Sequence, residues 1–395
     1  MKEIKRRNFL KLSGLSLLPA LLPPLALNAH SATVKNDVPA NPIISFTDDG
    51  VHYAPADYVA KLQEINQKDP LKADVYGQGG ALARLTKRFA EITGKEAATY
   101  MPTGTMANQL AISVLSGENT KIFVQDTSHI YRDEADAAQS VFNKRLMPLA
   151  PGAAYFTLED LKAGINYVNE GEVFKSGIGT VAIENPVRRC DGQQVPIEEI
   201  RKISAFCRSN GYKLHMDGAR IYLAAAVSGV SIAEYASNFD TVYISLYKYL
   251  GADGGAILCG DKVVIDKMEH LIKIHGGTVY SNWSKAAMAL YHLDGLEDRL
   301  KKTVAQATGL FEKLNKLPGI SINPIKGGSN IFDFKLTAAT DVKKFRQALY
   351  EKHKVIIRNA NHDGIIKLQI NETLLRADNQ SLVAAFTDAL AAAKV

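Results

Sequence analysis

The chain has 395 residues, of which 46% are hydrophobic and 22% charged, and its formal net charge is +6. These values are typical of a folded protein with one large or two coupled domains, and they exclude a disordered chain, a collagen, a coiled coil and a small disulfide scaffold. Five basic residues and one acidic residue lie within the first 29 positions, so the remainder is close to neutral. A nucleic-acid-binding surface is therefore not expected.

The N-terminus has the organisation of an export signal. A basic stretch at Lys5–Lys11 precedes an apolar run at Leu12–Ala29, and small residues at 29–31 offer a cleavage site. Gly14 and three prolines interrupt the run, which disfavours a membrane-spanning anchor. The arginine pair before Phe-Leu-Lys resembles the twin-arginine signal, with a plain secretory signal or a retained anchor as alternatives. We predict a signal peptide at residues 1–31 and a periplasmic or otherwise exported protein.

Beyond this segment the chain alternates helix and strand patterns. Residues 33–60 contain several prolines and are expected to be irregular. Apolar residues recur at helical spacing over 82–92 and 197–210. Short apolar strands are expected at residues 122–124, 181–183, 214–216, 242–244 and 256–258. Such alternation predicts a mostly parallel sheet that helices cover on both faces.

The pattern changes near residue 291 and predicts a second, smaller domain. Expected elements there are a helix at 301–317, a strand at 331–334, a helix at 341–352, strands at 355–357 and 366–368, and a last helix. The predicted organisation is a signal peptide at 1–31, an N-terminal segment at 32–60, a large domain at 61–290 and a small α+β domain at 291–395. Only three cysteines occur and none are in Cys-x-x-Cys spacing, so no metal site or redox pair is expected.

Polar groups follow several predicted strands, where open α/β sheets gather their binding sites. The turn at Thr103–Thr105 precedes a predicted helix, whose N-terminus can bind phosphate. His129 follows the strand at 122–124, and Asp217 follows the strand at 214–216. Taken singly, each of these has an ordinary explanation as a helix cap or a surface residue.

Lys248 lies between two tyrosines at the end of the strand at 242–244. Desolvation at such a position lowers the pKa of an amine and makes it available as a nucleophile. Together, a phosphate-binding turn, a carboxylate, a flat imidazole and a reactive lysine are the parts that pyridoxal phosphate requires.

These motifs resemble those of the threonine aldolases and the related aromatic amino acid β-eliminating lyases. The matching segments are Val75–Gly77, Gly94–Asn108, Ser128–Glu134, His215–Arg220 and Lys248–Ala252. The resemblance implies an aspartate-aminotransferase-like α/β large domain with a mostly parallel central sheet and a small α+β C-terminal domain. It also implies pyridoxal phosphate as cofactor, an amino acid as substrate, and a homodimer or homotetramer.

The resemblance further implies roles for particular residues. Lys248 would carry the cofactor covalently, Asp217 would face the pyridine nitrogen and His129 would stack on the ring. The remaining cofactor contacts would come from Gly104 and Thr105 at the phosphate and from Arg220 at the cofactor edge.

Departures from the family pattern fall on the substrate side. Asp48 replaces a serine, and Val187 replaces a second active-site histidine. Lys367 replaces an arginine that clamps the substrate carboxylate, and Val279 replaces an arginine that family dimers place near the phosphate. We expect substrate contacts from Asp48, Lys367 and the neighbouring Arg188.

The predicted activity is that of a lyase acting at the β-carbon of an amino acid. Retro-aldol cleavage of a β-hydroxy amino acid to glycine and an aldehyde is favoured, with β-elimination from another amino acid as the alternative. A binding protein that keeps the fold without catalysis also stays open. Ser245-x-x-Lys248 formally matches a serine acyltransferase motif, but that mechanism requires the serine at a helix start rather than on a strand.

Overall fold

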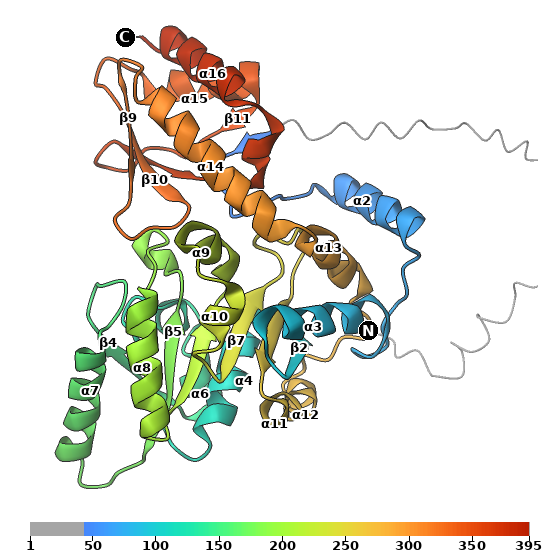
Figure 1. Ribbon diagram of the computed structural model, residues 1–395, viewed down its shortest axis with the longest axis vertical. Helices are drawn as coiled ribbons and strands as arrows, with labels where there is room; N and C mark the ends of the chain where they lie inside the picture. The colour runs from blue at the N-terminus through green and yellow to red at the C-terminus, as the bar shows by residue number, and fades with distance from the viewer. Residues whose placement is uncertain (1–42, 395) are drawn as a thin grey trace, which may run out of the picture. The chain divides into compact units, whose positions relative to one another are not determined.

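The computed structural model describes residues 43–394 (Figure 1). The predicted signal peptide at 1–31 lies outside the described residues. These described residues belong to one compact unit. Among the described residues, no helix combines the length and apolar character needed to cross a bilayer.

A seven-stranded sheet forms the centre of the described chain, with the strand order β2-β8-β7-β6-β5-β3-β4. Its strands are β2 (Ala97–Met101), β3 (Lys121–Gln125), β4 (Arg145–Leu149), β5 (Ile178–Glu184), β6 (Lys213–Asp217), β7 (Thr241–Ser245) and β8 (Ala256–Gly260). Strands β4, β3, β5, β6 and β7 are parallel, whereas β8 is antiparallel to both of its neighbours. The predicted mostly parallel sheet is confirmed.

Alternate residues of these strands enter different apolar clusters, which explains why helices cover both faces. Val242 and Ile244 belong to the largest cluster, whereas Tyr243 between them belongs to a cluster on the other face. The first face is covered by α3 (Gly80–Thr93), α7 (Leu158–Gly171), α8 (Ile197–Ser209), α9 (Ile221–Ser228), α10 (Ile232–Ala236) and α13 (Trp283–Leu293). The second face is covered by α4 (Gly104–Ser116), α5 (His129–Arg132), α6 (Ala137–Phe142), α11 (Lys262–Ile265) and α12 (Met268–Ile274).

The C-terminal part has its own apolar core. Its antiparallel sheet has the order β12-β10-β9, and a short parallel pair joins β1 to β11. The strands are β1 (Ile44–Ser45), β9 (Ile320–Pro324), β10 (Ile331–Leu336), β11 (Val355–Ile356) and β12 (Ile365–Gln369). Three helices pack with them: α14 (Leu296–Leu314), α15 (Val342–His353) and α16 (Asn379–Ala392).

Several local expectations were wrong. The segment at 33–60 is not wholly irregular, because it contributes β1 to the C-terminal core and starts α2 (Pro55–Lys68), with proline at the first helical position. Helix α14 begins at Leu296, five residues before the expected start. Strands β2 and β4 were missed because they are the two edges of the sheet and are only partly buried, so their residues are less uniformly apolar. Pro148 in β4 is tolerated at such an edge.

Candidate active site

The N-terminus of α4 forms one wall of the site. Thr103 caps the helix by accepting a hydrogen bond from the backbone N–H of Met106. Gly104 is the first helical residue, and a Cβ there would lie 2.2 Å from the Tyr243 hydroxyl oxygen. A side chain at position 104 would therefore have to displace the Tyr243 ring of β7, and glycine allows the close approach. Unpaired backbone N–H groups and the helix dipole make this end of α4 suitable for a phosphate.

Asp217 ends β6 and is 1% exposed. Its Oδ2 accepts a hydrogen bond from Asn108 Nδ2 at 3.1 Å, and its Oδ1 accepts from the backbone N–H of Ala219 at 3.1 Å. A carboxylate held in this way at the carboxyl edge of a parallel sheet can face the protonated nitrogen of a bound heterocycle. Glu134, which also bonds to Asn108, was not identified from sequence as a site residue.

Lys248 lies in the turn after β7 and is 8% exposed. Burial, with the nearby positive charge of Arg220, lowers the pKa of its amine to about 8. The charges of Asp217 and Glu184 also act on this amine, which places the three residues in one electrostatic cluster. Roughly a tenth of such an amine is neutral and nucleophilic at pH 7.

The N-terminal segment packs directly on the Lys248 turn. A Cβ at Gly50 would lie 2.5 Å from the Tyr249 Cα and 2.9 Å from the Lys248 carbonyl oxygen. This close approach brings Asp49 to Arg220, whose Nε donates to Asp49 Oδ1 at 2.9 Å.

One small-domain side chain reaches Asp49, and a second one holds it in place. Gln369 Nε2 donates to Asp49 Oδ1 at 2.5 Å, and Arg358 Nη2 donates to Gln369 Oε1 at 2.6 Å. Arg358 also bonds to the Thr47 carbonyl oxygen. Sequence reasoning missed all three residues, and the only local signal was the position of Asp49 beside Asp48.

His129 is the first residue of α5 and follows the short turn after β3. Its backbone N–H donates to Glu184 Oε2 at 2.7 Å, and its Nδ1 lies 3.1 Å from Asp133 Oδ2. The other Glu184 oxygen accepts from the Arg188 backbone N–H at 2.9 Å. Glu184 therefore ties the loop after β3 to the loop after β5. Burial and the charge of Asp217 raise its pKa to about 7.

Two arginines surround Asp133. Arg189 bonds to both of its carboxylate oxygens, and with His129 this lowers the pKa of Asp133 to about 2. Arg188 approaches the same carboxylate only at 3.5 Å, through Nη2. The Arg188 side chain is 47% exposed, so most of its donors are left for another anion.

The other predicted substrate residues are engaged within the chain. Lys367 Nζ lies 2.8 Å from an oxygen of Asp191 and 2.6 Å from an oxygen of Asp333. Asp48 Oδ2 accepts hydrogen bonds from the hydroxyls of Ser45 and Thr47, at 2.7 and 2.9 Å. Val187 is fully buried.

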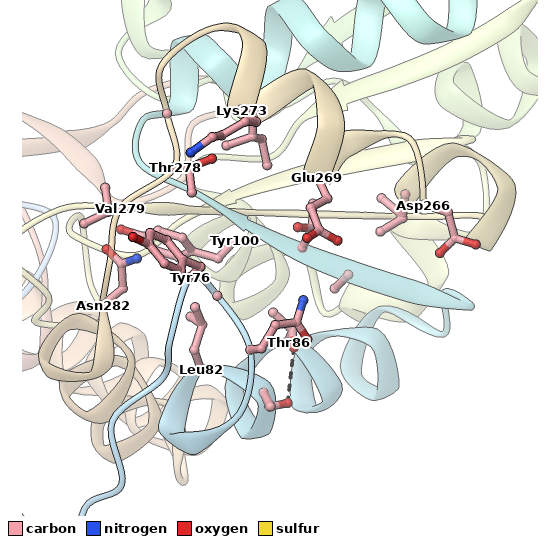
Figure 2. Close-up of a pocket in the computed structure, with 18 residues that line it drawn as sticks. Tyr76, Leu82, Thr86, Tyr100, Asp266, Glu269, Lys273, Thr278, Val279 and Asn282 are labelled. Atoms are coloured by element: carbon pink, nitrogen blue, oxygen red, sulfur yellow. Dashed lines mark hydrogen bonds between the residues drawn. The ribbon is translucent and has the colours of Figure 1, made fainter.

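A pocket of about 760 Å³ opens elsewhere, between α3, β2 and α12 (Figure 2). Tyr76, Val279 and Asn282 lie together at one end of it, and Asp266 lies at the other. Its lining includes none of the nine residues predicted for the cofactor or the substrate. The catalytic candidates are thus gathered at the carboxyl edge of the sheet rather than in this cavity. Within residues 43–394, no group of three or more His, Cys, Asp or Glu is arranged to hold a metal ion.

The geometry fits pyridoxal phosphate. The helix start at Gly104 offers backbone N–H groups that suit a phosphate, and Asp217 offers a buried, oriented carboxylate. Lys248 supplies a buried amine with a lowered pKa in the same cluster of charges. These features follow β2, β6 and β7, which run in the same direction, so they lie at the carboxyl edge of one sheet.

Comparisons with known proteins agree with this geometry. The model of the beta-eliminating lyase family matches residues 59–337. A low-specificity L-threonine aldolase from Candida albicans is 36% identical over 222 residues, covering 56% of this chain and 59% of the relative. The corresponding protein from Saccharomyces cerevisiae is 34% identical over 238 residues, covering 60% of each. The chain thus spans about three fifths of the length of these relatives.

Among solved structures, one from Exiguobacterium is named as an aromatic amino acid beta-eliminating lyase/threonine aldolase. It has a TM-score of 0.73 and 26% sequence identity, and the alignment covers 88% of this chain and 96% of that one. The family match over most of the chain and the shared fold lead to one conclusion. The chain belongs to the beta-eliminating lyase family.

Proposed function

We propose that this chain is a pyridoxal-phosphate-dependent lyase that cleaves a β-hydroxy amino acid to glycine and an aldehyde, in the manner of the threonine aldolases. The observation that carries the proposal is the buried Lys248 amine, which shares one electrostatic cluster with Asp217. The names of the aldolase relatives support the same reaction.

When bound, pyridoxal phosphate supplies an electron sink for negative charge at the substrate α-carbon. Lys248 would hold the cofactor covalently, Asp217 would pair with its ring nitrogen and His129 would lie against the ring. The phosphate would be held at Gly104 and Thr105. Arg220, oriented by Asp49, would contact the cofactor edge.

His129 is the group best placed to move the proton of the β-hydroxyl. Its Nδ1 is engaged by Asp133, which leaves Nε2 to exchange a proton with the substrate. The buried Val187 carries no titratable group and takes no part in proton transfer. A single imidazole would therefore serve where the family pattern has two.

Arg188 is the residue that we propose as the clamp for the substrate carboxylate. The alternative, Lys367, is held between Asp191 and Asp333. To bind a substrate carboxylate, Lys367 would have to give up one of these ion pairs. Arg188 has free donors and stands on the loop that Glu184 ties to His129. Its planar fork can bind a carboxylate through two parallel hydrogen bonds.

Asp48 adds a negative charge near the Lys248 turn, since it precedes Asp49 and Gly50 in the packed segment. We propose that it favours a substrate with an additional hydrogen-bond donor or positive charge. A substrate screen in which plain threonine is the best substrate would disprove this preference.

The second candidate function is β-elimination, and Val187 is the observation that favours it. Elimination requires Lys248 Nζ to remove the α-proton and a good leaving group at the β-carbon, but no second base for a hydroxyl. Products separate the two reactions, because aldol cleavage yields glycine and elimination yields a keto acid with ammonia.

We further propose that the chain assembles as a homodimer or homotetramer. Tyr76 and Tyr280 are 56% and 63% exposed, and their ring centroids lie 5.3 Å apart. Tyr76 lines the pocket in Figure 2 together with Val279, the residue before Tyr280. An exposed aromatic cluster of this kind is typical of an interaction surface, and the occupant would be a second copy of the chain. Light scattering would report a monomer if this assignment is wrong.

Export through a twin-arginine-like signal is proposed from the motif at Arg6 and Arg7 alone. A fusion of residues 1–31 to a reporter should reach the periplasm, and replacing both arginines with lysine should keep it in the cytoplasm.

The decisive test of the proposed activity is the visible absorption spectrum of the purified protein. A yellow protein whose band disappears on borohydride reduction, and whose Lys248→Ala variant cannot be fixed by reduction, would support the assignment. Glycine and aldehyde formation from β-hydroxy amino acids would then be measured. A protein that stays colourless after pyridoxal phosphate is added would favour the non-catalytic binding protein.

A further inference from the structure

Asn108 is the centre of a buried hydrogen-bond network that the proposed reaction does not by itself require. It lies on α4, one turn after Thr105, and is fully buried. Its Nδ2 donates to Asp217 Oδ2 at 3.1 Å and to Glu134 Oε1 at 2.8 Å. Both amide hydrogens are therefore used by carboxyl oxygens. The Asp217 carboxylate sets the orientation of the amide, because the opposite rotamer would turn the amide oxygen toward it.

The carbonyl side of the Asn108 amide is held from β6. Its Oδ1 lies 3.0 Å from His215 Nε2, and since Oδ1 can only accept, Nε2 must carry the proton. His215 Nδ1 then accepts from the hydroxyl of Thr241, 2.9 Å away and directly opposite in the parallel register. Burial lowers the pKa of His215 to about 4, so the ring is neutral and keeps this one tautomer.

The other branch of the network leads to the phosphate end of the site. Glu134 Oε1 accepts from Asn108 Nδ2, and the side chain of Thr105, in the first turn of α4, acts on the same carboxyl. Burial and the charge of Asp217 raise the pKa of Glu134 to about 8, so this carboxyl is mostly neutral at pH 7. A neutral Glu134 limits the negative charge gathered beside Asp217.

We propose that Asn108 is the positioning residue of the cofactor ring: the chain Thr241–His215–Asn108 holds the Asp217 carboxylate in one orientation, and Asn108 also connects this carboxylate to Glu134. The role in the ring's placement rests on the proposed pyridoxal-phosphate function. Asn108 itself touches Asp217 and not the reacting atoms, so it acts through that carboxylate. Every polar atom of the Asn108 side chain is bonded to a buried partner. A water molecule could replace one of these bonds only by breaking it.

The first test compares wild type, Asn108→Ala and Thr241→Val by titration with pyridoxal phosphate and by the pH dependence of the visible band. Loss of a hydrogen bond to a charged group predicts roughly 10- to 100-fold weaker binding for Asn108→Ala, with a shifted pH midpoint of the band. Thr241→Val nearly preserves shape and removes only the outermost donor, so its shift should have the same direction and be smaller. Ser116→Ala is the matched control, because Ser116 is a buried hydroxyl on the same helix that bonds to Thr180 and not to the network.

The second test uses the cofactor-free protein and does not depend on turnover. Nitrogen NMR of the histidines should show His215 with the proton on Nε2, and its shifts should move in Asn108→Ala and Thr241→Val but not in Ser116→Ala. Circular dichroism establishes that each variant is folded, and Asn108→Ser replaces Asn108→Ala if the latter is not.

The outcomes separate the two proposals. A proton on Nδ1 of His215, or wild-type affinity with an unshifted band in a folded Asn108→Ala protein, overturns the positioning role alone. Wild-type protein that binds no pyridoxal phosphate overturns the proposed function and the ring-positioning role together.

Discussion

Replacing Lys248 with methionine should stabilise the cofactor-free protein, because burying the charged amine lowers the free energy of unfolding. Its pKa falls from an ordinary value of 10.5 to about 8 in the folded chain. At about 1.4 kcal/mol per pH unit, this shift corresponds to about 3 kcal/mol. The side chain is 8% exposed, so solvent screening reduces the figure little. Methionine has a similar length and leaves no large cavity, unlike alanine.

The pH dependence follows from the direction of the shift. Below pH 8 the amine is charged in both states, and the full penalty of burying the charge is present. Between pH 8 and 10.5 the unfolded chain binds the proton and the folded chain does not, so the stability of the wild type rises with pH across this window. The stability gained by Lys248→Met over wild type should thus be largest below pH 8 and should disappear as the pH approaches 10.5.

Urea unfolding of both cofactor-free proteins from pH 6 to 11 measures this difference. Lys326→Met, at an exposed lysine, is the control and should change stability by less than about 0.5 kcal/mol at every pH. A stability difference between Lys248→Met and wild type that stays constant from pH 6 to 11 would refute the reasoning, since a packing effect has no such dependence.

Three further predictions concern contacts in and around the site. Gly104→Ala should weaken pyridoxal phosphate binding at least about tenfold, because the new Cβ would lie 2.2 Å from the Tyr243 hydroxyl oxygen; Gly171→Ala, where a Cβ meets nothing within 4 Å, should bind normally. Arg188→Ala should raise KM for the amino acid roughly 10- to 100-fold with a smaller change in kcat, whereas an equal KM effect in Lys367→Ala instead would contradict the choice of clamp. Gly50→Ala should lower the free energy of unfolding by about 1–3 kcal/mol, since the added Cβ meets backbone atoms that cannot rotate away; an unchanged urea midpoint would count against that packing.

The sequence alone was sufficient for the five inner strands of the central sheet and for the polar residues at their ends. Buried parallel strands are short continuous apolar runs, so β5, β6 and β7 were predicted, and with them the positions of Asp217 and Lys248. Edge strands β2 and β4 lack that signal because solvent reaches them. The glycine at position 104 could be read as a helix start, but its steric need depends on Tyr243 from a distant strand.

Only the tertiary structure decided which groups share the site. Glu184 joins His129 to Arg188 across the ends of two strands, and Asp49 reaches Arg220 from 171 positions away in the chain. Such contacts leave no local pattern, because hydrogen bonds between side chains depend on the packing of whole elements. The same holds for Lys367. Its charge can be seen in the sequence, but its pairing with Asp191 and Asp333 depends on how β12 packs against β10 and the turn after β5. The hydrophobic pattern of the sequence therefore determined which polar residues lie at the ends of strands. The tertiary structure determined which of these residues are bonded to other side chains and which can bind a ligand.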